Sequence, residues 1–215
     1  MNNQKILSHV DHTLLKAVAD RNAIDKLCQE AIKFGTASVC IPPSYVAEVH
    51  LNYPNLNICT VIGFPLGYST TAVTVFEAMQ AVADGANEID MVINLGDVKN
   101  GEFNKVTAEI SQIKLAIGNH LLKVIVETCY LTEDEKISLC HCVTDGGADY
   151  IKTSTGFGTS GAMIDDVILF GQNIGKEIKI KAAGGIKTKA DLLVFLEHGC
   201  ERIGASGAIE ILRVN

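Results

Sequence analysis

Two lysines near the ends of apolar segments are the residues in this sequence best placed to do chemistry. Lys152 lies in the segment 149–158 (DYIKTSTGFG), and Lys181 lies in the segment 178–185 (IKIKAAGG). Most lysines of soluble proteins keep the ammonium group in water, so a lysine late in a strand indicates either an amine nucleophile or a structural ion pair. A nucleophilic amine has to be neutral, which requires that the usual lysine pKa of about 10.4 fall by about three units.

Lys181 is expected to favour the neutral form of Lys152 if their strands are neighbours. Adjacent strands lie about 4.8 Å apart, and a nearby cation together with desolvation lowers the pKa of an amine. Side chains alternate along a strand, so the apolar residues of 178–182 can face helices and leave Lys179 and Lys181 on the other face. Lys179 comes earlier in the strand, so Lys181 is the better candidate. The alternative is that both lysines extend into solvent.

Asp90 and Asp11 are the acidic candidates. Asp90 lies in the segment 88–94 (EIDMVIN), and Asp11 lies in the segment 10–14 (VDHTL). A carboxylate that faces two lysines stays ionised and can accept or relay protons, which predicts a catalytic role for Asp90. Asp11 is predicted to be a second catalytic carboxylate, with a turn or helix-cap aspartate as the alternative.

Three glycine-containing loops indicate a phosphate site. Backbone amides at a helix N-terminus bind phosphate, and barrel enzymes often place such a site after the seventh and eighth strands. Taken singly, each glycine pair is equally consistent with a tight turn. A short helix over 208–212 can complete the site. The predicted substrate- or phosphate-binding residues are Thr155, Gly156, Gly184, Gly185, Gly204, Ser206 and Gly207.

Strand and helix patterns alternate along the chain and supply the framework for these residues. Short β-branched runs are followed by amphipathic stretches, which is typical of parallel strands with connecting helices. Strands are expected at Ser8–Asp11, Ala37–Ile41, Asn57–Ile62, Glu88–Ile93, Leu122–Glu127, Asp149–Ser154, Ile178–Ala183 and Arg202–Ala205. Helices are expected at Arg21–Phe34, Thr70–Asp84, Phe103–Ile117, Thr132–Asp145, Ile164–Ile174 and Lys189–His198.

Eight such units predict an α/β protein with a single (β/α)8 (TIM) barrel as one domain over residues 1–215. An open doubly wound sheet is the alternative, but its G-x-G-x-x-G turn is missing after the first strand. In a barrel, catalytic groups lie at the C-terminal ends of strands, and alternate strands can place Asp90 and Lys152 in one layer. Expected capping features are the Thr132–Glu135 box and left-handed caps at Gly35, Gly85, Gly146 and Gly199.

Composition and charge exclude several kinds of partner. The formal net charge of −7 argues against nucleic acid and anionic membranes. No apolar run reaches the length of a membrane span, and residues 1–7 do not resemble a secretory signal, so a cytoplasmic protein is expected. The seven cysteines are odd in number and include no C-x-x-C pair, so they are expected to be reduced. No metal site is expected, including at residues 140–142 (CHC).

The segments that carry the candidate residues resemble those of deoxyribose-phosphate aldolases. The resemblance runs in order along essentially the whole chain, and the combination of its two lysine-containing strings is specific. These strings are YIKTSTG at 150–156 and KAAGGI at 181–186, joined by DHTLL at 11–15, ASVCIP at 37–42, EIDMV at 88–92 and RIGAS at 202–206.

The resemblance implies reversible cleavage of 2-deoxy-D-ribose 5-phosphate to D-glyceraldehyde 3-phosphate and acetaldehyde, a step of deoxyribose catabolism. It implies that Lys152 forms an imine with the acetaldehyde portion, that Lys181 holds down the pKa of Lys152, and that Asp90 relays protons through water. An iminium is itself an electron sink, so no cofactor is expected. Cys40 is implied to lie near the site without being needed, and the family commonly forms homodimers.

Three positions depart from the pattern of some family members. Some members end in a tail whose terminal tyrosine assists proton transfer, and residues 212–215 contain no tyrosine. Phe157 stands where some members have a lysine that contacts phosphate, and Gly207 stands where some have a serine. These differences predict weaker phosphate selectivity, with binding that rests more on backbone amides and on Ser206.

Two other functions are consistent with part of these sequence features. A transaldolase or a keto-acid aldolase would keep Lys152 but use a different donor, and substrate competition would distinguish it. A phosphosugar isomerase or a non-catalytic phosphate-binding barrel would keep the glycine loops without needing both Lys152 and Lys181.

Overall fold

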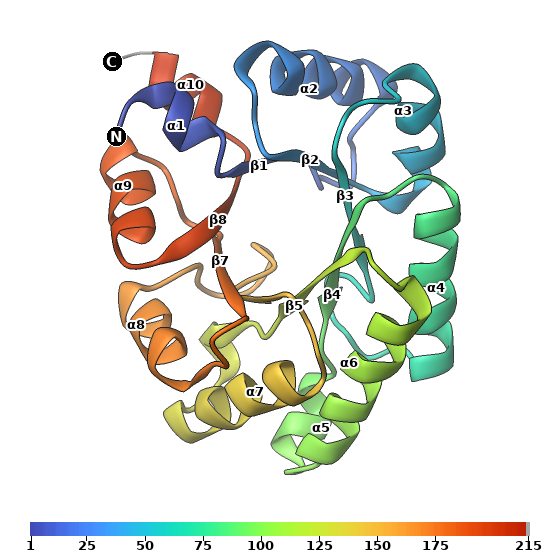
Figure 1. Ribbon diagram of the computed structural model, residues 1–215, viewed down its shortest axis with the longest axis vertical. Coiled ribbons are helices and arrows are strands. Elements are labelled where there is room, and N and C mark those ends of the chain that lie inside the picture. Colours follow the sequence, from blue (N-terminus) through green and yellow to red (C-terminus); the bar gives the residue numbers. More distant parts are fainter. Residues whose placement is uncertain (214–215) are drawn as a thin grey trace.

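A closed barrel of parallel strands forms the centre of the computed structural model, which describes residues 1–213 (Figure 1). Each strand pairs with the next, and β1 also pairs with β8 through Val10 and Ile203, which excludes the open doubly wound sheet. The predicted (β/α)8 barrel is therefore confirmed. The strands within the described residues are β1 (Val10–Thr13), β2 (Ser38–Ile41), β3 (Ile58–Ile62), β4 (Glu88–Val92), β5 (Leu121–Ile125), β6 (Tyr150–Lys152), β7 (Lys179–Ala183) and β8 (Cys200–Ala205).

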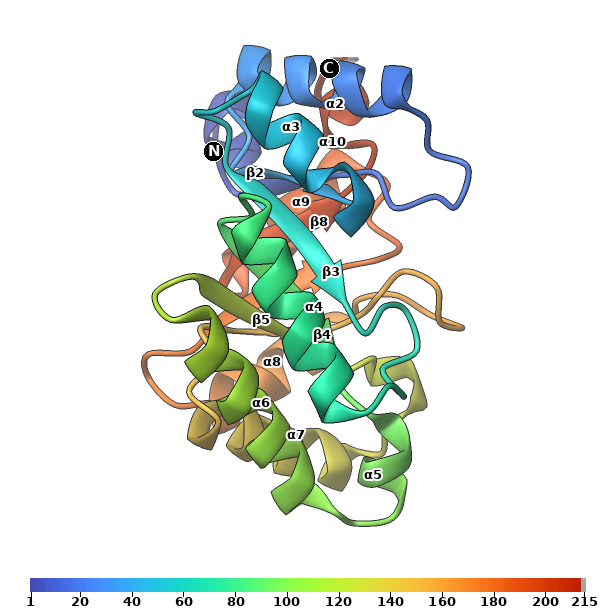
Figure 2. The ribbon, with the colours of Figure 1, turned by 90° about the vertical axis from the view of Figure 1, so that its right-hand side faces the viewer.

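Helices surround the barrel, as Figures 1 and 2 show from two directions. The first and last described helices pack together, and the Asn3 side-chain amide donates to the Leu212 carbonyl at 2.9 Å. The helices α1 and α10 therefore lie side by side on the outside of the barrel (Figure 1). The helices are α1 (Asn3–Leu7), α2 (Arg21–Phe34), α3 (Val46–Asn52), α4 (Thr71–Ala83), α5 (Leu95–Lys99), α6 (Phe103–Ile117), α7 (Glu133–Asp145), α8 (Ile164–Asn173), α9 (Lys189–Glu197) and α10 (Ala208–Arg213), with 3-10 turns at Pro43–Tyr45 and Thr128–Tyr130.

Capping interactions fix several helix ends. The Glu135 backbone N–H donates to the Thr132 hydroxyl and the Thr132 N–H donates to the Glu135 carboxylate, which confirms the predicted capping box. Gly35 ends α2 in the left-handed conformation, as predicted. The prediction for Gly146 was wrong: this residue follows the last residue of α7 with a right-handed φ of −71° and packs against Ile110 of α6, and the positive φ of 74° is found at Gly147. Positive φ is also found at Gly85 and Gly199.

Strand ends differ from the sequence-based expectation by a few residues. The first strand was expected at Ser8–Asp11 but begins at Val10, because α1, which the sequence analysis did not predict, buries Ile6 and Leu7 in the preceding turns. The sixth strand was expected to reach Ser154 but ends at Lys152. Beyond it, Thr153 leaves the regular ladder, and its hydroxyl bonds to Ala183 of β7.

The apolar core is divided into two parts. A large cluster fills the layer between the barrel and its helices, and a small separate cluster of Cys40, Cys59 and Val61 lies inside the barrel, with Leu15 and Phe64 packed against it. Much of the remaining barrel interior is charged, whereas most barrels fill theirs with branched aliphatic side chains. The charged side chains are Asp11, Glu88, Asp90, Lys123, Lys152, Lys181 and Arg202.

No helix within residues 1–213 is long and apolar enough to cross a membrane. Residues 214–215, which belong to the segment where the sequence analysis noted the missing tyrosine, lie outside the described residues.

Candidate active site

Lys152 and Lys181 are side by side at the barrel interior. The two residues are register partners on β6 and β7, so their side chains leave the sheet at the same height. Lys152 is 3% exposed and Lys181 is fully buried. Lys179, the earlier lysine of β7, lies on the surface and pairs with Glu201 at 3.3 Å. The structure therefore brings Lys181, and not Lys179, to Lys152.

Asp90 joins these two lysines. The Lys152 and Lys181 ammonium groups each donate to Asp90 Oδ2 at 2.7 Å. Lys123 Nζ donates to the other oxygen, Oδ1, at 2.8 Å. Burial alone would raise the pKa of Asp90, but the charges of Lys123, Lys152 and Lys181 outweigh it and hold that pKa well below its usual range. Asp90 is consequently a buried carboxylate that stays ionised.

Lys123 is a member of the site that the sequence analysis did not single out. It lies in the apolar run of β5, and a lysine within an apolar run is the sequence signal that identified Lys152. In the structure Lys123 is fully buried. Its ammonium group contacts Glu88 at 2.6 Å, Asp90 at 2.8 Å and Asp11 at 3.8 Å. Burial would lower the pKa of Lys123, but the surrounding acidic groups, Asp90 foremost, raise it well above the usual value.

Asp11 is fully buried within β1, which rules out the alternative of an exposed turn or helix-cap aspartate. It forms ion pairs with Lys181 and Arg202 and accepts a hydrogen bond from the Ser38 hydroxyl at 2.7 Å. Burial would raise the pKa of Asp11, but the charges of Lys181, Lys123 and Arg202 hold it far below the usual value. Asp11 thus contacts Lys181 directly, while Lys152 pairs with Asp90.

The buried charges nearly cancel, and Lys152 is the member with the fewest acidic partners. Three carboxylates face four cations in this interior. Among the described ion pairs, Lys152 contacts Asp90 alone, whereas each of the other three cations contacts at least two carboxylates. The network therefore balances without the charge of Lys152, and neutralising this amine leaves every carboxylate with a cationic partner. The carboxylates are Asp11, Glu88 and Asp90, and the other cations are Lys123, Lys181 and Arg202.

A pocket of about 220 Å³ opens next to Lys152 at the C-terminal rim of the barrel. Most of the predicted binding residues line it, whereas Gly207 is not among the lining residues and precedes α10. Ser206 is exposed within it. The lining residues are Thr13, Leu15, Lys152, Thr155, Gly156, Ala183, Gly184, Gly185, Ile186, Gly204, Ala205 and Ser206.

Tight backbone contacts shape the glycine side of this pocket. Gly184 and Gly185 have φ values of 83° and 76°, which favour glycine. Gly161, which the sequence analysis did not select, packs so closely that a Cβ there would lie 2.3 Å from the Gly184 carbonyl oxygen. The Ala162 N–H donates to the Gly184 carbonyl at 3.1 Å. The loop after β6 therefore holds the loop after β7 in place.

Thr155 is hydrogen-bonded to Glu127, a residue that was not predicted from the sequence. Its backbone N–H and its hydroxyl both donate to the buried carboxylate of Glu127, and its hydroxyl accepts from the Phe157 N–H at 3.0 Å. Glu127 has a φ of 56°, which is uncommon for a residue other than glycine and occurs mostly where structure over-determines it. The Phe157 ring packs edge-on against Phe64 with centroids 5.4 Å apart.

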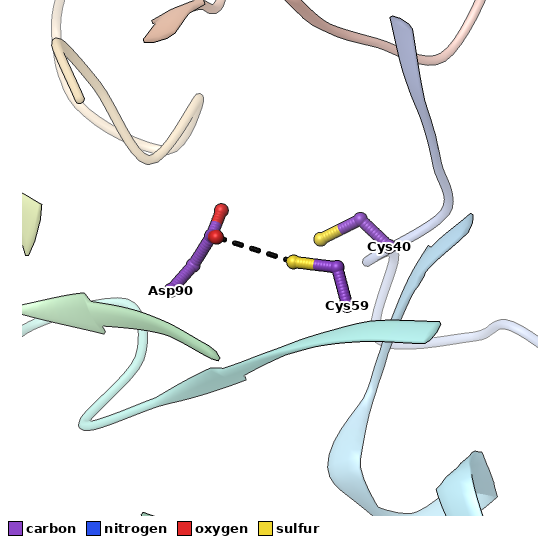
Figure 3. A group of neighbouring side chains, drawn as sticks. All are labelled: Cys40, Cys59 and Asp90. Carbon is purple, nitrogen blue, oxygen red and sulfur yellow. Dashed lines mark hydrogen bonds between the residues drawn. The ribbon is translucent and has the colours of Figure 1, made fainter. Parts of the chain in front are cut away.

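Cys40, Cys59 and Asp90 point toward one another inside the barrel (Figure 3). The Cys59 thiol donates to Asp90 Oδ1 at 3.1 Å and accepts from Lys123 Nζ at 3.3 Å. The donor atoms of Cys40, Cys59 and Asp90 lie within 4.8 Å of one another, a spacing that a metal ion can use. However, both oxygens of Asp90 already accept from lysine ammonium groups, so an added cation would meet strong repulsion here.

The fold and this pocket define a (β/α)8-barrel protein with a buried lysine–carboxylate network beside a glycine-lined cavity. The family model of the DeoC/LacD family aldolases matches residues 5–213. The chain belongs to this family of aldolases.

Individual relatives are similar over nearly their whole length. A deoxyribose-phosphate aldolase of Clostridium botulinum is 58% identical over 214 residues, which is 99% of this chain and 97% of the relative. One of Clostridioides difficile is 54% identical over 210 residues, covering 97% and 95%. A solved structure of a candidate deoxyribose-phosphate aldolase from Coccidioides immitis has a TM-score of 0.96 at 37% identity, covering 100% of this chain and 87% of that one.

Proposed function

We propose that the protein cleaves 2-deoxy-D-ribose 5-phosphate reversibly to D-glyceraldehyde 3-phosphate and acetaldehyde through an imine on Lys152. The observation that carries this proposal is the placement of Lys152, which lines the pocket and is also the buried cation with the fewest carboxylate partners. Only a neutral amine attacks a carbonyl, and the balance of the remaining charges allows this amine to be neutral. The similarity to deoxyribose-phosphate aldolases supports the choice of substrate.

The reaction begins when the Lys152 nitrogen attacks C1 of the open-chain sugar and the resulting carbinolamine loses water. A base then takes the proton of the C3 hydroxyl, the C2–C3 bond breaks, and its electrons form an enamine while glyceraldehyde 3-phosphate leaves. The enamine takes a proton at C2, and water releases acetaldehyde. The iminium accepts the electron pair, so the organic chemistry is done by the protein's own amine.

Asp90 and Lys181 are the groups we assign to the proton transfers. Both lie against Lys152, since Asp90 Oδ2 accepts from Lys152 and from Lys181 at 2.7 Å. Burial would lower the pKa of Lys181, but Asp11 and Asp90 raise it far above the usual value, so Lys181 is protonated at the start of each transfer and is the group that donates. Asp11 pairs with Lys181 and holds that lysine in place.

The phosphate group is proposed to bind at the glycine side of the pocket. The proposed contacts are the backbone of Gly156, Gly184, Gly185 and Gly204 together with Ser206, which surround the open end of the cavity. Thr155 and Gly207 act through loop geometry, because the Thr155 hydroxyl already donates to Glu127 and Gly207 lies outside the lining. No lysine is among the lining residues besides Lys152, so phosphate selectivity is expected to be modest.

Trapping of the imine tests the mechanism. The protein is incubated with acetaldehyde, reduced with borohydride, digested and mapped by peptide mass. The expected result is an ethyl group on Lys152 alone, with no modification in the Lys152→Ala variant. Modification at Lys181 or Lys123, or no modification at all, would contradict the assignment. Lys179→Ala is a matched control, because this lysine is exposed at the N-terminal end of β7, away from the pocket, and its loss should leave the labelling unchanged.

We further propose that residues 1–215 act as one catalytic domain, that the protein is cytoplasmic, and that it forms a homodimer. The continuous barrel from β1 to β8 and the family match over residues 5–213 support the first proposal. The presence of seven free thiols is consistent with a reducing compartment.

A further inference from the structure

Two of the seven cysteines differ from the rest in position. Cys28, Cys140, Cys142 and Cys200 lie buried in the layer between barrel and helices, where they pack as small apolar residues. Cys40 and Cys59 instead belong to the small cluster inside the barrel, next to the charged network.

The strand register places Cys40 and Cys59 opposite each other. They are Cα partners on the parallel strands β2 and β3. Neighbouring strands are separated by about 4.8 Å, which falls inside the Cα–Cα range of about 4.4–6.8 Å that disulfides span. Both side chains point into the barrel, and their sulfur atoms lie within 4.8 Å of each other (Figure 3). The register and the short sulfur separation are therefore compatible with a disulfide between these residues.

The surroundings make these two thiols chemically unequal. Burial raises the thiol pKa of Cys28 to about 11 and of Cys140 and Cys200 to about 12, which keeps them protonated. The pKa of Cys40 is lowered, chiefly by its contact with Cys59 and further by the nearby charges of Lys181 and Lys152. Burial raises the pKa of Cys59 well above the usual value. Of the two, Cys40 is therefore the more nucleophilic thiol, and Cys59 lies beside it as a partner that can condense with its oxidised form.

Two cavities border the small cluster that contains this pair. A cavity of about 210 Å³ at the barrel mouth is lined by Leu15, Val61 and Phe64, which belong to or pack against the same cluster. Leu15 also lines the pocket beside Lys152. Cys40 and Cys59 are themselves fully buried, so an oxidant reaches them from these cavities when the side chains packed against the cluster, Leu15 and Phe64, move aside.

We propose that Cys40 and Cys59 are a redox-modification site, in which a hydroperoxide converts the two thiols to an intramolecular disulfide that lowers turnover. The Cys40 thiolate attacks one peroxide oxygen, the O–O bond breaks, and Cys40 becomes a sulfenic acid. The Cys59 sulfur then attacks the Cys40 sulfur, its proton goes to the departing hydroxide, and water leaves. In sum, two thiols and one hydrogen peroxide give one disulfide and two waters.

The disulfide would remove one of the hydrogen bonds that Asp90 accepts. In the reduced protein the Cys59 thiol donates to Asp90 Oδ1, and Lys123 donates to the Cys59 sulfur. The disulfide has no S–H group, so Asp90 loses one of its donors and the neighbouring lysines rearrange. This effect on turnover rests on the proposed function, whereas formation of the disulfide does not.

The test combines mass mapping with activity. The reduced protein is treated with one equivalent of hydrogen peroxide, blocked with a maleimide and digested without reductant. We expect a peptide pair joined through Cys40 and Cys59, a loss of two titratable thiols, and a several-fold drop in lyase rate that dithiothreitol restores. Cys129→Ser is the matched control, because Cys129 is the one cysteine of the seven that is not buried and its loss should leave the crosslink intact.

The variants Cys59→Ala and Cys40→Ala show whether the pair is responsible. Each should abolish the crosslinked peptide, and oxidised Cys59→Ala should carry a sulfenic acid on Cys40 that dimedone traps, since Cys40 then has no neighbouring thiol with which to condense. Absence of the crosslink in oxidised wild-type protein, which needs no variant to fold, would overturn the proposal. An inactive reduced enzyme would contradict the proposed function instead, and the peptide map would still report on the disulfide.

Discussion

Lys152 stands apart from the other buried cations because only one carboxylate contacts it among the described residues, and that carboxylate is shared. Removing its charge leaves three carboxylates with three cations. We therefore predict that Lys152→Ala folds with a melting temperature close to that of the wild type and loses at least about a thousandfold in lyase rate. Calorimetry and a coupled glyceraldehyde 3-phosphate assay measure the two effects. A variant that kept even a tenth of the wild-type rate would show that another amine carries the reaction.

Lys123 is predicted to set the pH at which the enzyme works, although it lies outside the pocket lining. In a Lys123→Met variant, Asp90 loses one of its three lysine donors, so its negative charge is neutralised more by its pair with Lys152. The pH–rate profile of kcat/KM should shift to higher pH, with a loss of about a hundredfold at neutral pH that narrows at alkaline pH. A uniform loss at every pH would indicate a purely structural role. Lys136→Met, which breaks a partly exposed pair with Asp166, is the control.

At the scale of elements, the loops after β6 and β7 act as one unit because Gly161 packs against Gly184. A Cβ at position 161 would lie 2.3 Å from backbone atoms of Gly184, so the backbone of one loop must move. We predict that Gly161→Ala raises KM for the phosphorylated sugar about tenfold or more and changes kcat less, since the proposed phosphate contacts are displaced.

The matched control for this prediction is Gly171→Ala in α8, where an added Cβ meets nothing within 4 Å. That substitution should leave both kinetic constants unchanged and stabilise the protein by up to about 1 kcal/mol, because alanine favours helix. An equal rise in KM for the unphosphorylated sugar in Gly161→Ala would locate the defect away from the phosphate.

At the scale of the whole molecule, the buried network makes stability depend on acid. The pKa values of Asp11 and Asp90 are lower in the folded protein than in the unfolded chain. Their contribution is therefore present above the unfolded carboxyl pKa of about 3.9 and is lost as the pH falls toward the folded values. Urea midpoints should fall steeply below about pH 4.

The variant Asp11→Asn identifies the origin of this acid dependence. It leaves Lys181 and Arg202 with one fewer carboxylate, so we expect a loss of about 3–5 kcal/mol in the free energy of unfolding at neutral pH. The slope of stability against pH should also decrease. An unchanged slope would mean that other carboxylates cause the acid sensitivity.

The proposed homodimer is tested by sedimentation equilibrium of the full chain. A particle of twice the 23.0 kDa chain mass is expected at micromolar concentration. A single-chain mass across that range would contradict the proposal.

The sequence by itself determined the fold class and most of the site, because both follow from local patterns. Alternating strand and helix patterns predict the barrel, and a lysine in an apolar run identifies Lys152 and Lys181 without any knowledge of their partners. The same signal was present at Lys123 but was not used. Strand ends and the handedness of Gly146 were less well predicted, since a helix that precedes β1 and close packing between α6 and α7 decide them.

Only the tertiary structure decided how the charges are matched. Asp11, Glu88 and Arg202 come from different strands; barrel closure between β1 and β8 brings Asp11 to Arg202 and Lys181, and the closed barrel places Arg202 of β8 against Glu88 of β4. No sequence spacing encodes this closure, because it depends on the stagger of all eight strands. The sequence therefore identified Lys152 as the candidate amine. The closed barrel determined which carboxylates surround Lys123 and Lys181 and raise the pKa values of these two lysines.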